Sequence, residues 1–335
     1  MVGWPVWIFV ALAPWTWFIW RTWHGVLELA AIGLPAICAT LFLISLRFGI
    51  VGRDWRALLP TVSMLILFFV AVVQPSSAAP SGEIAGPTAR ILSANLESNW
   101  FSDNDFYWHL ETNPSDIVVA SEMQQPHRTM LRDRFAYYVD DVIPAPELRV
   151  EPEPGDNSYR RFGFPSIGVY SNYPLTMLED TTGIEDGLPG FRVRVEMPDG
   201  PVILYALHVP KPSFRDGLYQ VDFTTHRNMA RLISEAASQE ELPVVVAGDL
   251  NMTDRGVGYQ SFLSAGLHDG MRATTAPPTS NKGFLWDLLR LRIDHILVDD
   301  SLCTESPSSD IVRFTDHRII GVEFGPCLNG SSPAT

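Results

Sequence analysis

The N-terminal part of the chain contains three long apolar segments. Residues 4–20 and 57–73 carry no charged side chain, and residues 25–46 carry only Glu28, near the beginning of that segment. Each segment approaches the roughly 17–25 residues that a helix needs to cross a membrane. Tryptophan is concentrated around the first segment, as expected at a bilayer interface, and a signal peptide would have a single apolar segment. The pattern therefore predicts a three-helix transmembrane anchor within residues 1–74.

The arginines between the apolar segments predict how these helices are oriented. Residues 47–56 carry three arginines, whereas residues 21–24 carry one. Positive side chains favour the cytoplasmic side of a membrane. We therefore expect a multi-pass protein of the cell membrane, held in the bilayer by residues 4–73. Everything after Gln74 is then expected outside the cytoplasm.

Beyond the apolar segments the pattern changes twice. Residues 75–87 are small, polar and rich in proline and glycine, which is typical of a flexible linker. Residues 88–335 alternate β-favouring runs with turn residues, and the predicted strands read RILSAN, DIVVAS, SIGVYS, FRVRVEM, VILYALH, PVVVAGD, DHILVD and RIIGVEF. Helical stretches are Thr224–Ala237 and Gly258–Ala265. We expect an α+β domain in which sheet packs on sheet with helices outside.

Charge separates the two regions. The whole chain has a net charge of −14; residues 1–87 contribute +1, which leaves −15 for the remainder. Nucleic-acid affinity comes largely from lysine and arginine at phosphates, and the domain has only Lys211 and Lys282, besides arginines such as Arg160 and Arg161. Charge alone therefore does not favour a polyanion partner, whereas clustered carboxylates suit divalent cations.

Three cysteines are too few for a disulfide scaffold. Cys38 lies within an apolar segment, and Cys303 and Cys327 lie near the C-terminus. The last two can pair only where the domain faces an oxidising compartment. The sequence leaves that pairing open.

Polar side chains collect where the predicted strands begin or end. A rigid strand can hold such a side chain in place while the loop beyond it opens to a substrate. An Asp or Asn after a strand is usually a turn residue, and a single histidine or glutamate often has a structural role. No single member therefore predicts a site, but the whole set does. The set is Asn95, Glu97, Glu122, His208, Asp249, Asn251, Asp294, His295, Asp316 and His317.

The most informative short motif is VVVAGDLN. Its apolar residues predict a buried strand, Gly248 allows a close approach of backbones, and strand periodicity places Asp249 and Asn251 on one side. A carboxylate and an amide there can hold a metal, a phosphate oxygen or a water. The motif TDHR adds His317, which can act as a general base when a carboxylate such as Asp294 orients it.

Seven segments together resemble the endonuclease/exonuclease/phosphatase family, which includes deoxyribonuclease I, abasic-site endonucleases, neutral sphingomyelinases and inositol-polyphosphate 5-phosphatases. The segments span residues 91–320 in the order of the family: ILSANLE, IVVASEMQ, GFPSIGVYSNYPL, LYALHVP, VVVAGDLN, RIDHILV and FTDHRII. The resemblance implies a four-layer α/β/β/α sandwich of the deoxyribonuclease I type over residues 88–335. It also implies hydrolysis of phosphate esters.

The resemblance implies a site for Mg²⁺ or Mn²⁺. Glu122 matches the principal metal-binding glutamate of the family and Asn95 the asparagine beside it. Asp316 matches an additional ligand on the metal side, and Glu97 is a weaker match to a further carboxylate. Mg²⁺ binds a few carboxylates together with waters, which suits so sparse a set of ligands.

The resemblance also implies catalytic roles. His317 matches the catalytic histidine and Asp294 its carboxylate partner. Asp249 and Asn251 match the pair that contacts the nucleophile and the scissile phosphate. His208 matches a second histidine, which binds the phosphate in the deoxyribonuclease I and sphingomyelinase branches and which abasic-site endonucleases tend to lack.

Three positions depart from the family pattern. The chain has GDLN where GDFN is common and TDH where SDH is common, and both changes keep the chemistry. Asn172 stands where an arginine often follows the serine of the GxxxxSxxP segment. That change removes a positive charge and puts the substrate contact at this position in doubt.

The sequence thus predicts a membrane-anchored, metal-dependent phosphoesterase, with a nuclease-like phosphodiesterase ranked first. The alternatives are a phospholipase C-like enzyme of the sphingomyelinase type, favoured by an anchor close to lipid headgroups, and a phosphomonoesterase for lipid or inositol phosphates. An inactive binding module on the same fold would lack metal binding. A channel or transporter is disfavoured because Glu28 is the single ionisable residue within the apolar segments.

Overall fold

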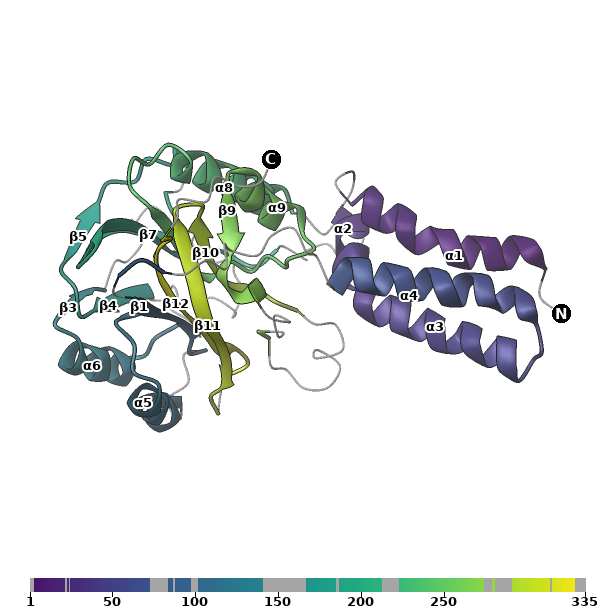
Figure 1. The fold of residues 1–335 in the computed structure, drawn as a ribbon, viewed down its shortest axis with the longest axis horizontal. Coiled ribbons are helices and arrows are strands. Elements are labelled where there is room, and N and C mark those ends of the chain that lie inside the picture. The colour runs from purple at the N-terminus through teal and green to yellow at the C-terminus, as the bar shows by residue number, and fades with distance from the viewer. Residues whose placement is uncertain are drawn as a thin grey trace, which may run out of the picture.

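Two mixed β-sheets form the centre of the larger part of the protein (Figure 1). The computed structural model describes residues 3–21, 23, 25–72, 84–86, 88–97, 102–140, 167–184, 187–212, 223–273, 279–280, 291–313 and 315–328. Within these residues each sheet has six strands. The strand order of the first sheet is β11 (Leu302–Ile311), β12 (Arg318–Pro326), β1 (Ala89–Asn95), β2 (Ile117–Ser121), β4 (Ile167–Ser171) and β3 (Tyr137–Val139). The strand order of the second sheet is β5 (Leu175–Leu178), β6 (Gly190–Met197), β7 (Gly200–His208), β8 (Val244–Asp249), β10 (Asp294–Asp299) and β9 (Leu267–Asp269).

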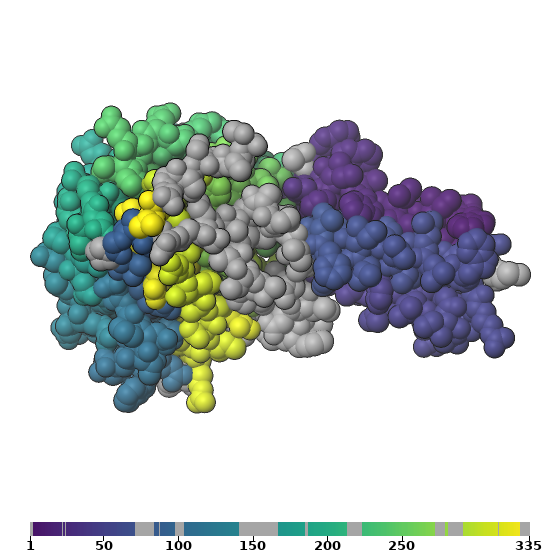
Figure 2. Space-filling view, in the orientation of Figure 1, coloured from purple at the N-terminus to yellow at the C-terminus, as the bar shows by residue number. Residues whose placement is uncertain are grey.

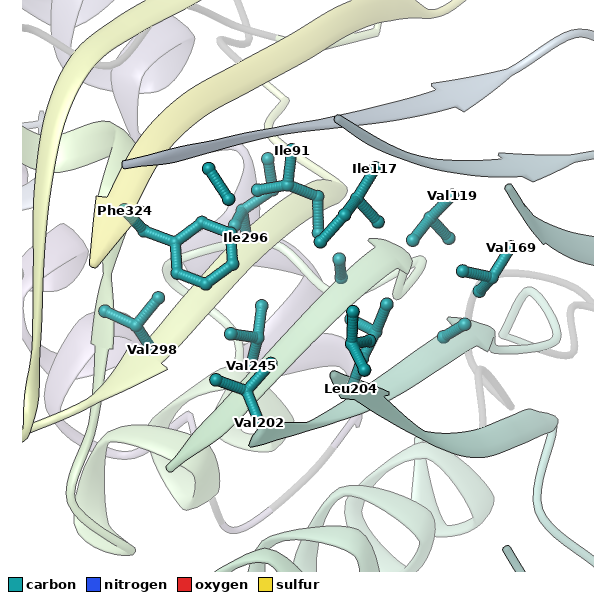
Figure 3. Packing of buried hydrophobic residues seen from close by; sticks show 14 of the residues in the cluster. Ile91, Ile117, Val119, Val169, Val202, Leu204, Val245, Ile296, Val298 and Phe324 are labelled. Atoms are coloured by element: carbon teal, nitrogen blue, oxygen red, sulfur yellow. The ribbon is translucent and has the colours of Figure 1, made fainter. Parts of the chain in front are cut away.

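The sheets pack face to face because each strand presents apolar side chains to the space between them. In β6 every second residue is buried, as a period of two requires. Ile91 and Val119 of the first sheet lie in one cluster with Leu204, Val245 and other residues of the second (Figure 3). This layer is the main hydrophobic core of the domain.

Helices cover both outer faces of the sandwich (Figure 1). Helices α5 (Ser102–Thr112) and α6 (Gln125–Arg134) pack on the first sheet, and α8 (Thr224–Ala237) and α9 (Val257–Ser264) pack on the second. In α8 the buried residues Ala230, Ile233 and Ala237 recur at helical spacing. The predicted α+β sandwich with layers α/β/β/α is therefore confirmed.

The N-terminal region is a bundle of helices that projects from the sandwich domain (Figures 1 and 2). Its helices are α1 (Trp4–Ile19), α2 (Gly25–Ile32), α3 (Leu34–Ile50) and α4 (Leu58–Val72), with a 3₁₀ turn at Trp55–Ala57. Leu34, Cys38, Met64 and Leu67 are buried between α3 and α4. Many apolar side chains on the outer faces of the bundle are exposed, among them Phe9, Leu43, Val62 and Phe69.

The single helix predicted over residues 25–46 was wrong. The structure divides it at Gly33 into α2 and α3, whose axes are bent by 65°. Proline at position 35 disfavours a continuous helix, because it lacks an N–H and its ring clashes with the preceding turn. Among the described residues no single helix is both long and apolar enough to cross a membrane, while the bent α2–α3 pair satisfies that criterion together. Of the predicted linker, residues 84–86 are described, and the rest lies outside the described residues.

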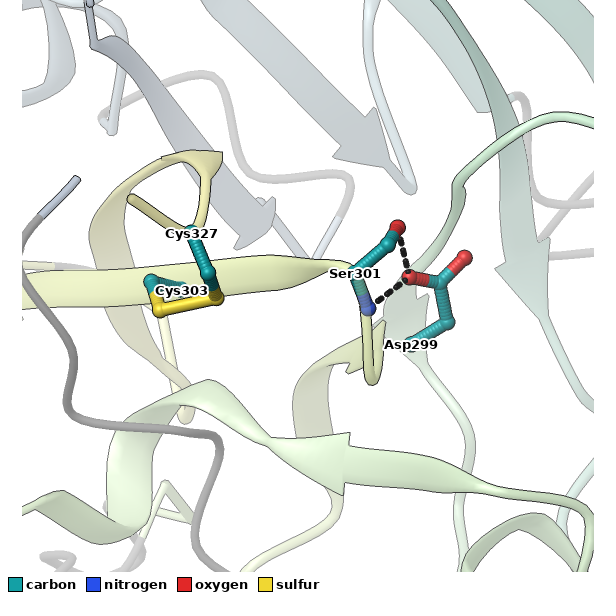
Figure 4. The surroundings of a disulfide bond; sticks show 4 residues. All are labelled: Asp299, Ser301, Cys303 and Cys327. Carbon is teal, nitrogen blue, oxygen red and sulfur yellow. Dashed lines mark hydrogen bonds between the residues drawn. A yellow bond between two sulfur atoms is a disulfide. The ribbon is translucent and has the colours of Figure 1, made fainter. Parts of the chain in front are cut away.

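A disulfide joins Cys303 of β11 to Cys327, directly after β12 (Figure 4). The two strands are antiparallel neighbours. Close by, Asp299 accepts hydrogen bonds from the backbone and the hydroxyl of Ser301, which closes the turn between β10 and β11. The pairing that the sequence left open is therefore present.

Candidate active site

The predicted site residues meet at one edge of the sandwich, because the strands that carry them end there. β1 and β2 are parallel neighbours in the first sheet, as β7 and β8 are in the second. In the second sheet His208 and Asp294 each pair in register with Asp249, from the two sides of β8. Neighbouring strands thus place a histidine and two carboxylates side by side.

Asn95 joins the two sheets at this edge. It lies at the end of β1 and is 2% exposed. Its Nδ2 donates to Glu122 Oε1 and to Asp249 Oδ2, each at 3.0 Å. Its amide oxygen accepts from the backbone N–H of Glu97 at 3.0 Å. In this arrangement Asn95 orients the two carboxylates through its NH₂ group, and its predicted role as a metal ligand stays a prediction.

Two clusters among the described residues could hold a metal ion, and they share Asp249. The first contains Glu122, His208 and Asp249, with His208 Nε2 3.5 Å from Glu122 Oε1 and 3.7 Å from Asp249 Oδ2. The second contains Asp249, Asp294 and His317. Two carboxylates close together are stabilised by a divalent cation, and carboxylate oxygens are the ligands that Mg²⁺ and Mn²⁺ prefer. The residues present therefore fit such an ion.

His317 is held by a buried carboxylate. Its Nδ1 lies 2.9 and 3.1 Å from the two oxygens of Asp294, and both side chains are almost fully buried. Its Nε2 points the other way, 3.4 Å from Asp316 Oδ1 and 3.9 Å from Asp249 Oδ2. Burial by itself lowers the pKa of His317, but Asp294, then Asp249 and Asp316, raise this pKa to about 10. The imidazole therefore carries a proton and a positive charge among three carboxylates.

Glu97 belongs to the same site. Its carboxylate accepts from the backbone N–H of Asp316 at 3.0 Å. Glu97, Glu122 and Asn251 all have left-handed backbone conformations, with φ near +50°. Such conformations are uncommon outside glycine and cluster at functional sites. The structure thus brings the predicted site residues to one edge, except His295, whose ring packs against Tyr259 and lies 2.7 Å from the carbonyl oxygen of Met252.

Asn251 reaches the site by a different route from the one predicted. Strand β8 ends at Asp249, so a strand period of two does not extend to Asn251. Its backbone N–H instead donates to Asp249 Oδ1 at 2.8 Å, and its Nδ2 donates to the carbonyl oxygen of Val209 at 2.8 Å. A local turn, not strand alternation, brings the two side chains together.

Gly248 is required where β8 passes β7. Its φ is +140°, and a Cβ there would lie 1.9 Å from the carbonyl oxygen of Leu207. No side chain fits at that distance, so the glycine allows the close approach that places Asp249 beside His208. The interpretation of this glycine from the sequence is confirmed.

Two threonines that the sequence did not single out hold the backbone of the hydrogen-bonded pair His317 and Asp294. Thr279 Oγ1 accepts from the backbone N–H of Asp294 at 3.0 Å. Thr315 Oγ1 donates to the carbonyl oxygen of Asn95 and accepts from the backbone N–H of His317. Each lies in a segment without regular secondary structure, and no sequence signal distinguishes it from an ordinary loop threonine.

Asn172, where the sequence puts a substrate contact in doubt, lies away from the other site residues. Asn172 follows β4, and its backbone N–H donates to the carbonyl oxygen of Asp116, just before β2 begins. Glu122 follows the other end of β2, so Asn172 lies at the opposite edge of the sheet. The arginines at 160 and 161 and Lys282 lie outside the described residues.

Comparisons with known proteins agree with this architecture. The model of the Endonuclease/Exonuclease/phosphatase family matches residues 89–317. The sequence matches no curated protein.

Three solved structures are similar to the chain at 15% sequence identity. A family protein from Beutenbergia cavernae has a TM-score of 0.51 over 72% of each chain. A 3′ phosphatase from Neisseria, bound to a product DNA hairpin, has a TM-score of 0.50 over 70% of this chain and 99% of its own. An AP endonuclease from Archaeoglobus fulgidus has a TM-score of 0.50 over 70% and 98%. These likenesses show the fold, and because the family model covers well over half of the chain, the protein belongs to the Endonuclease/Exonuclease/phosphatase family.

Proposed function

We propose that this protein is a divalent-metal-dependent phosphodiesterase with nuclease-like chemistry. The observation that carries the proposal is the pair of clusters that share Asp249, one with Glu122 and His208 and the other with Asp294 and His317. Glu122 and Asp249 would hold the cation, with Asp316 beside them. The bound Mg²⁺ or Mn²⁺ supplies positive charge against the phosphoryl oxygens.

Side chains of the protein carry out the remaining steps of the hydrolysis. Asp294 fixes the ring of His317, so that Nε2 faces Asp249 and Asp316. Asp249 would accept the proton of the attacking water, and the protonated His317 would position that water through a hydrogen bond from Nε2. His208 and Asn251 stabilise the negative charge that develops on the phosphate oxygens.

The first-ranked substrate is a nucleic-acid phosphodiester. The nuclease-like position of His208, in one group with Glu122 and Asp249, supports it, as does the DNA product bound to the similar Neisseria enzyme. The second candidate is a phosphodiester in a lipid headgroup. It is supported by the −15 charge outside residues 1–87 and by the apolar helical bundle next to the domain.

We also propose that the bundle attaches the protein to the cell membrane with the sandwich domain outside the cytoplasm. Support comes from the apolar side chains exposed on α1, α3 and α4, because large exposed apolar surfaces mark contact with membranes or partners. The disulfide between Cys303 and Cys327 supports an oxidising compartment. A reporter fused after Thr335 tests the orientation, and a cytoplasmic signal would contradict it.

Activity is tested with the full chain in detergent or in lipid nanodiscs. We expect hydrolysis of bis(p-nitrophenyl) phosphate with Mg²⁺ or Mn²⁺, and loss of that activity with EDTA and in the variants Glu122→Ala and His317→Ala. Activity that survives these changes would overturn the mechanism. Parallel assays with single-stranded DNA, double-stranded DNA and sphingomyelin vesicles then rank the substrates.

A further inference from the structure

Helix α2 of the N-terminal bundle contacts the sandwich domain through a buried carboxylate. Glu28 is 2% exposed. One of its oxygens accepts from the guanidinium of Arg227 in α8, with the Nε at 2.9 Å. Its other oxygen accepts from the backbone N–H of Val257, the first residue of α9, at 2.8 Å. Glu28 thereby pairs with one helix and caps the next, where an acidic group is favoured by the unpaired N–H groups.

A second contact lies at the other end of α2. The carbonyl oxygen of Ile32, the last residue of α2, accepts from Arg255 Nε at 3.1 Å. The side chain of Arg255 is 1% exposed and also donates to Asp254. A buried guanidinium is stable only when such partners surround it. The carbonyl groups that end a helix lack partners within the helix, so this contact satisfies both sides.

The two contacts fall at the end of the segment that leads away from strand β8 and on the residue that follows it. This segment, Leu250–Gly256, connects Asp249 to α9 and contains Asn251. Its other side is held by β10 and by Ile293, the residue before β10. The backbone N–H of Leu250 donates to the carbonyl oxygen of Ile293, and His295 Nε2 lies 2.7 Å from the carbonyl oxygen of Met252. The segment is thus fixed between the strand that carries Asp294 and a helix of the bundle.

Asn251 needs such restraint. Its φ of +48° lies in the left-handed region, which costs free energy for a residue other than glycine and persists only where the surroundings enforce it. Its hydrogen bonds to Asp249 and to Val209, the residue after β7, hold it on the side of the strands. The contacts of α2 with Val257 and Arg255 fix the segment on its far side.

We propose that Glu28 is a positioning residue for the reaction, and that α2 is a part of the catalytic unit in addition to its place in the bundle. It acts through the segment that holds Asn251, and it does not touch the substrate. A helix that served only to anchor the chain would not require a buried ion pair and a helix cap on the domain. Only the kinetic test of this inference rests on the proposed function.

The test uses the full chain in nanodiscs. Glu28→Gln keeps the shape but removes the charge, and Arg227→Gln removes the partner, which is 27% exposed and therefore tolerant of substitution. The matched control is Glu235→Gln, which breaks the exposed pair with Arg231 on the same helix α8. For each variant, kcat and KM are measured with bis(p-nitrophenyl) phosphate and Mn²⁺, and the exchange of backbone amides in residues 250–257 is followed at a temperature well below unfolding.

We expect Glu28→Gln and Arg227→Gln each to lower kcat about 10-fold or more, because small displacements of positioning groups are costly, with KM changed less than twofold. The double variant should be no worse than the more impaired single variant, since both act through one contact. The amides of Asn251 and Val257 should exchange faster in both, and the control should match the wild type.

A folded Glu28→Gln or Arg227→Gln protein with wild-type kcat and unchanged amide protection would overturn the inference. If the wild type itself lacks metal-dependent activity, the proposed function fails while the exchange experiment still decides the inference: faster exchange supports it and unchanged exchange overturns it. A fall in thermal stability with unchanged kcat would make Glu28 a structural link only, which also overturns it.

Discussion

At the scale of single residues, the proposed catalysis depends most on one buried hydrogen bond, the one between His317 and Asp294. Asp294 is 1% exposed and contacts Nδ1 with both oxygens. Its charge is the first of the carboxylate influences that raise the pKa of His317 against the effect of burial. The orientation and the protonation of the ring therefore depend on the same carboxylate.

Replacing Asp294 by asparagine should lower kcat by about 100-fold or more, which is the contribution expected of a correctly oriented acid–base group. The amide keeps the size of the side chain but removes the charge that orients and protonates the ring. The measurement is kcat with bis(p-nitrophenyl) phosphate, together with an NMR titration of His317, whose pKa should fall. The control is Asp300→Asn, which alters another aspartate–histidine pair, with His268, away from the site. Equal activities of the two variants would contradict the assigned role.

Gly248→Ala should destabilise the domain by about 3 kcal/mol or more, because a Cβ meets the Leu207 carbonyl oxygen at 1.9 Å and the left-handed conformation is strained as well. Gly266→Ala is the matched control. Its φ is also positive, at +86°, but a Cβ there has no neighbour within 4 Å, so only the conformational cost of about 1 kcal/mol remains. Urea unfolding measures both, and equal losses would show that the close approach to Leu207 is unimportant.

The residues of the site were largely predictable because they lie at, or within a few residues of, the ends of strands with a clear apolar pattern. Asp249 and Glu122 follow buried strands, and register then decides which partners they meet. Thr279 and Thr315 were not predictable, since a hydroxyl in a loop acquires its role only from distant parts of the chain. The place of Asn172 at the opposite edge of the sheet was also not predictable, because a motif gives the order of residues but not the edge on which each one lies.

At the scale of secondary structure, the central strands were predicted and the edge strands were not. The strands that the sequence missed are β3, β5, β9 and β11, which are the four edges of the two sheets in the described part of the chain. Most central strands are packed on both faces and have nearly continuous apolar sequences, and β6 alternates apolar and polar residues with a period of two. Edge strands are short or polar, and β11 even contains Pro307 and a bulge between Glu305 and Ser308, which an edge tolerates.

Helix α6 contains a histidine that should make stability depend on pH. His127 is fully buried, and its Nδ1 accepts from the backbone N–H of Gln124 at 3.0 Å, at the start of the helix. A protonated Nδ1 cannot accept this bond. Burial accordingly lowers the pKa of His127 to about 4, whereas an unfolded chain has a histidine pKa of about 6.5.

The contribution of His127 to stability is therefore complete above about pH 6.5 and is lost as the pH falls toward about 4, because the unfolded chain binds the proton first. The loss amounts to about 1 kcal/mol per pH unit.

His127→Gln accepts the same bond at every pH, so its free energy of unfolding should fall less than that of the wild type between pH 7 and pH 4.5. Urea unfolding at several pH values measures the difference. His268→Gln, at a half-buried position, serves as the control, and parallel curves for wild type and His127→Gln would contradict the prediction.

At the scale of the whole molecule, the helical bundle and the catalytic edge of the sandwich lie on the same side of the domain. Helix α2 contacts the segment that follows β8, so the site adjoins the bundle. The sequence predicted an anchor joined to the domain by a flexible linker, and it could not predict this contact. Glu28 lies in an apolar segment and meets Arg227 nearly two hundred residues later, a distance over which local patterns carry no information.

The disulfide provides the test of where the domain resides. Cys303 and Cys327 are bonded, and Cys38 is free but buried in the bundle. If the domain lies outside the cytoplasm, a Cys38→Ser protein taken from native membranes and denatured should not react with a maleimide–polyethylene glycol reagent until it is reduced. Cys303→Ser in that background should then expose one reactive thiol, that of Cys327. Reduction should also lower the free energy of unfolding by about 3 kcal/mol, because it removes the constraint on the unfolded chain. Free thiols in the unreduced Cys38→Ser protein would place the domain in a reducing compartment, since a disulfide does not persist there.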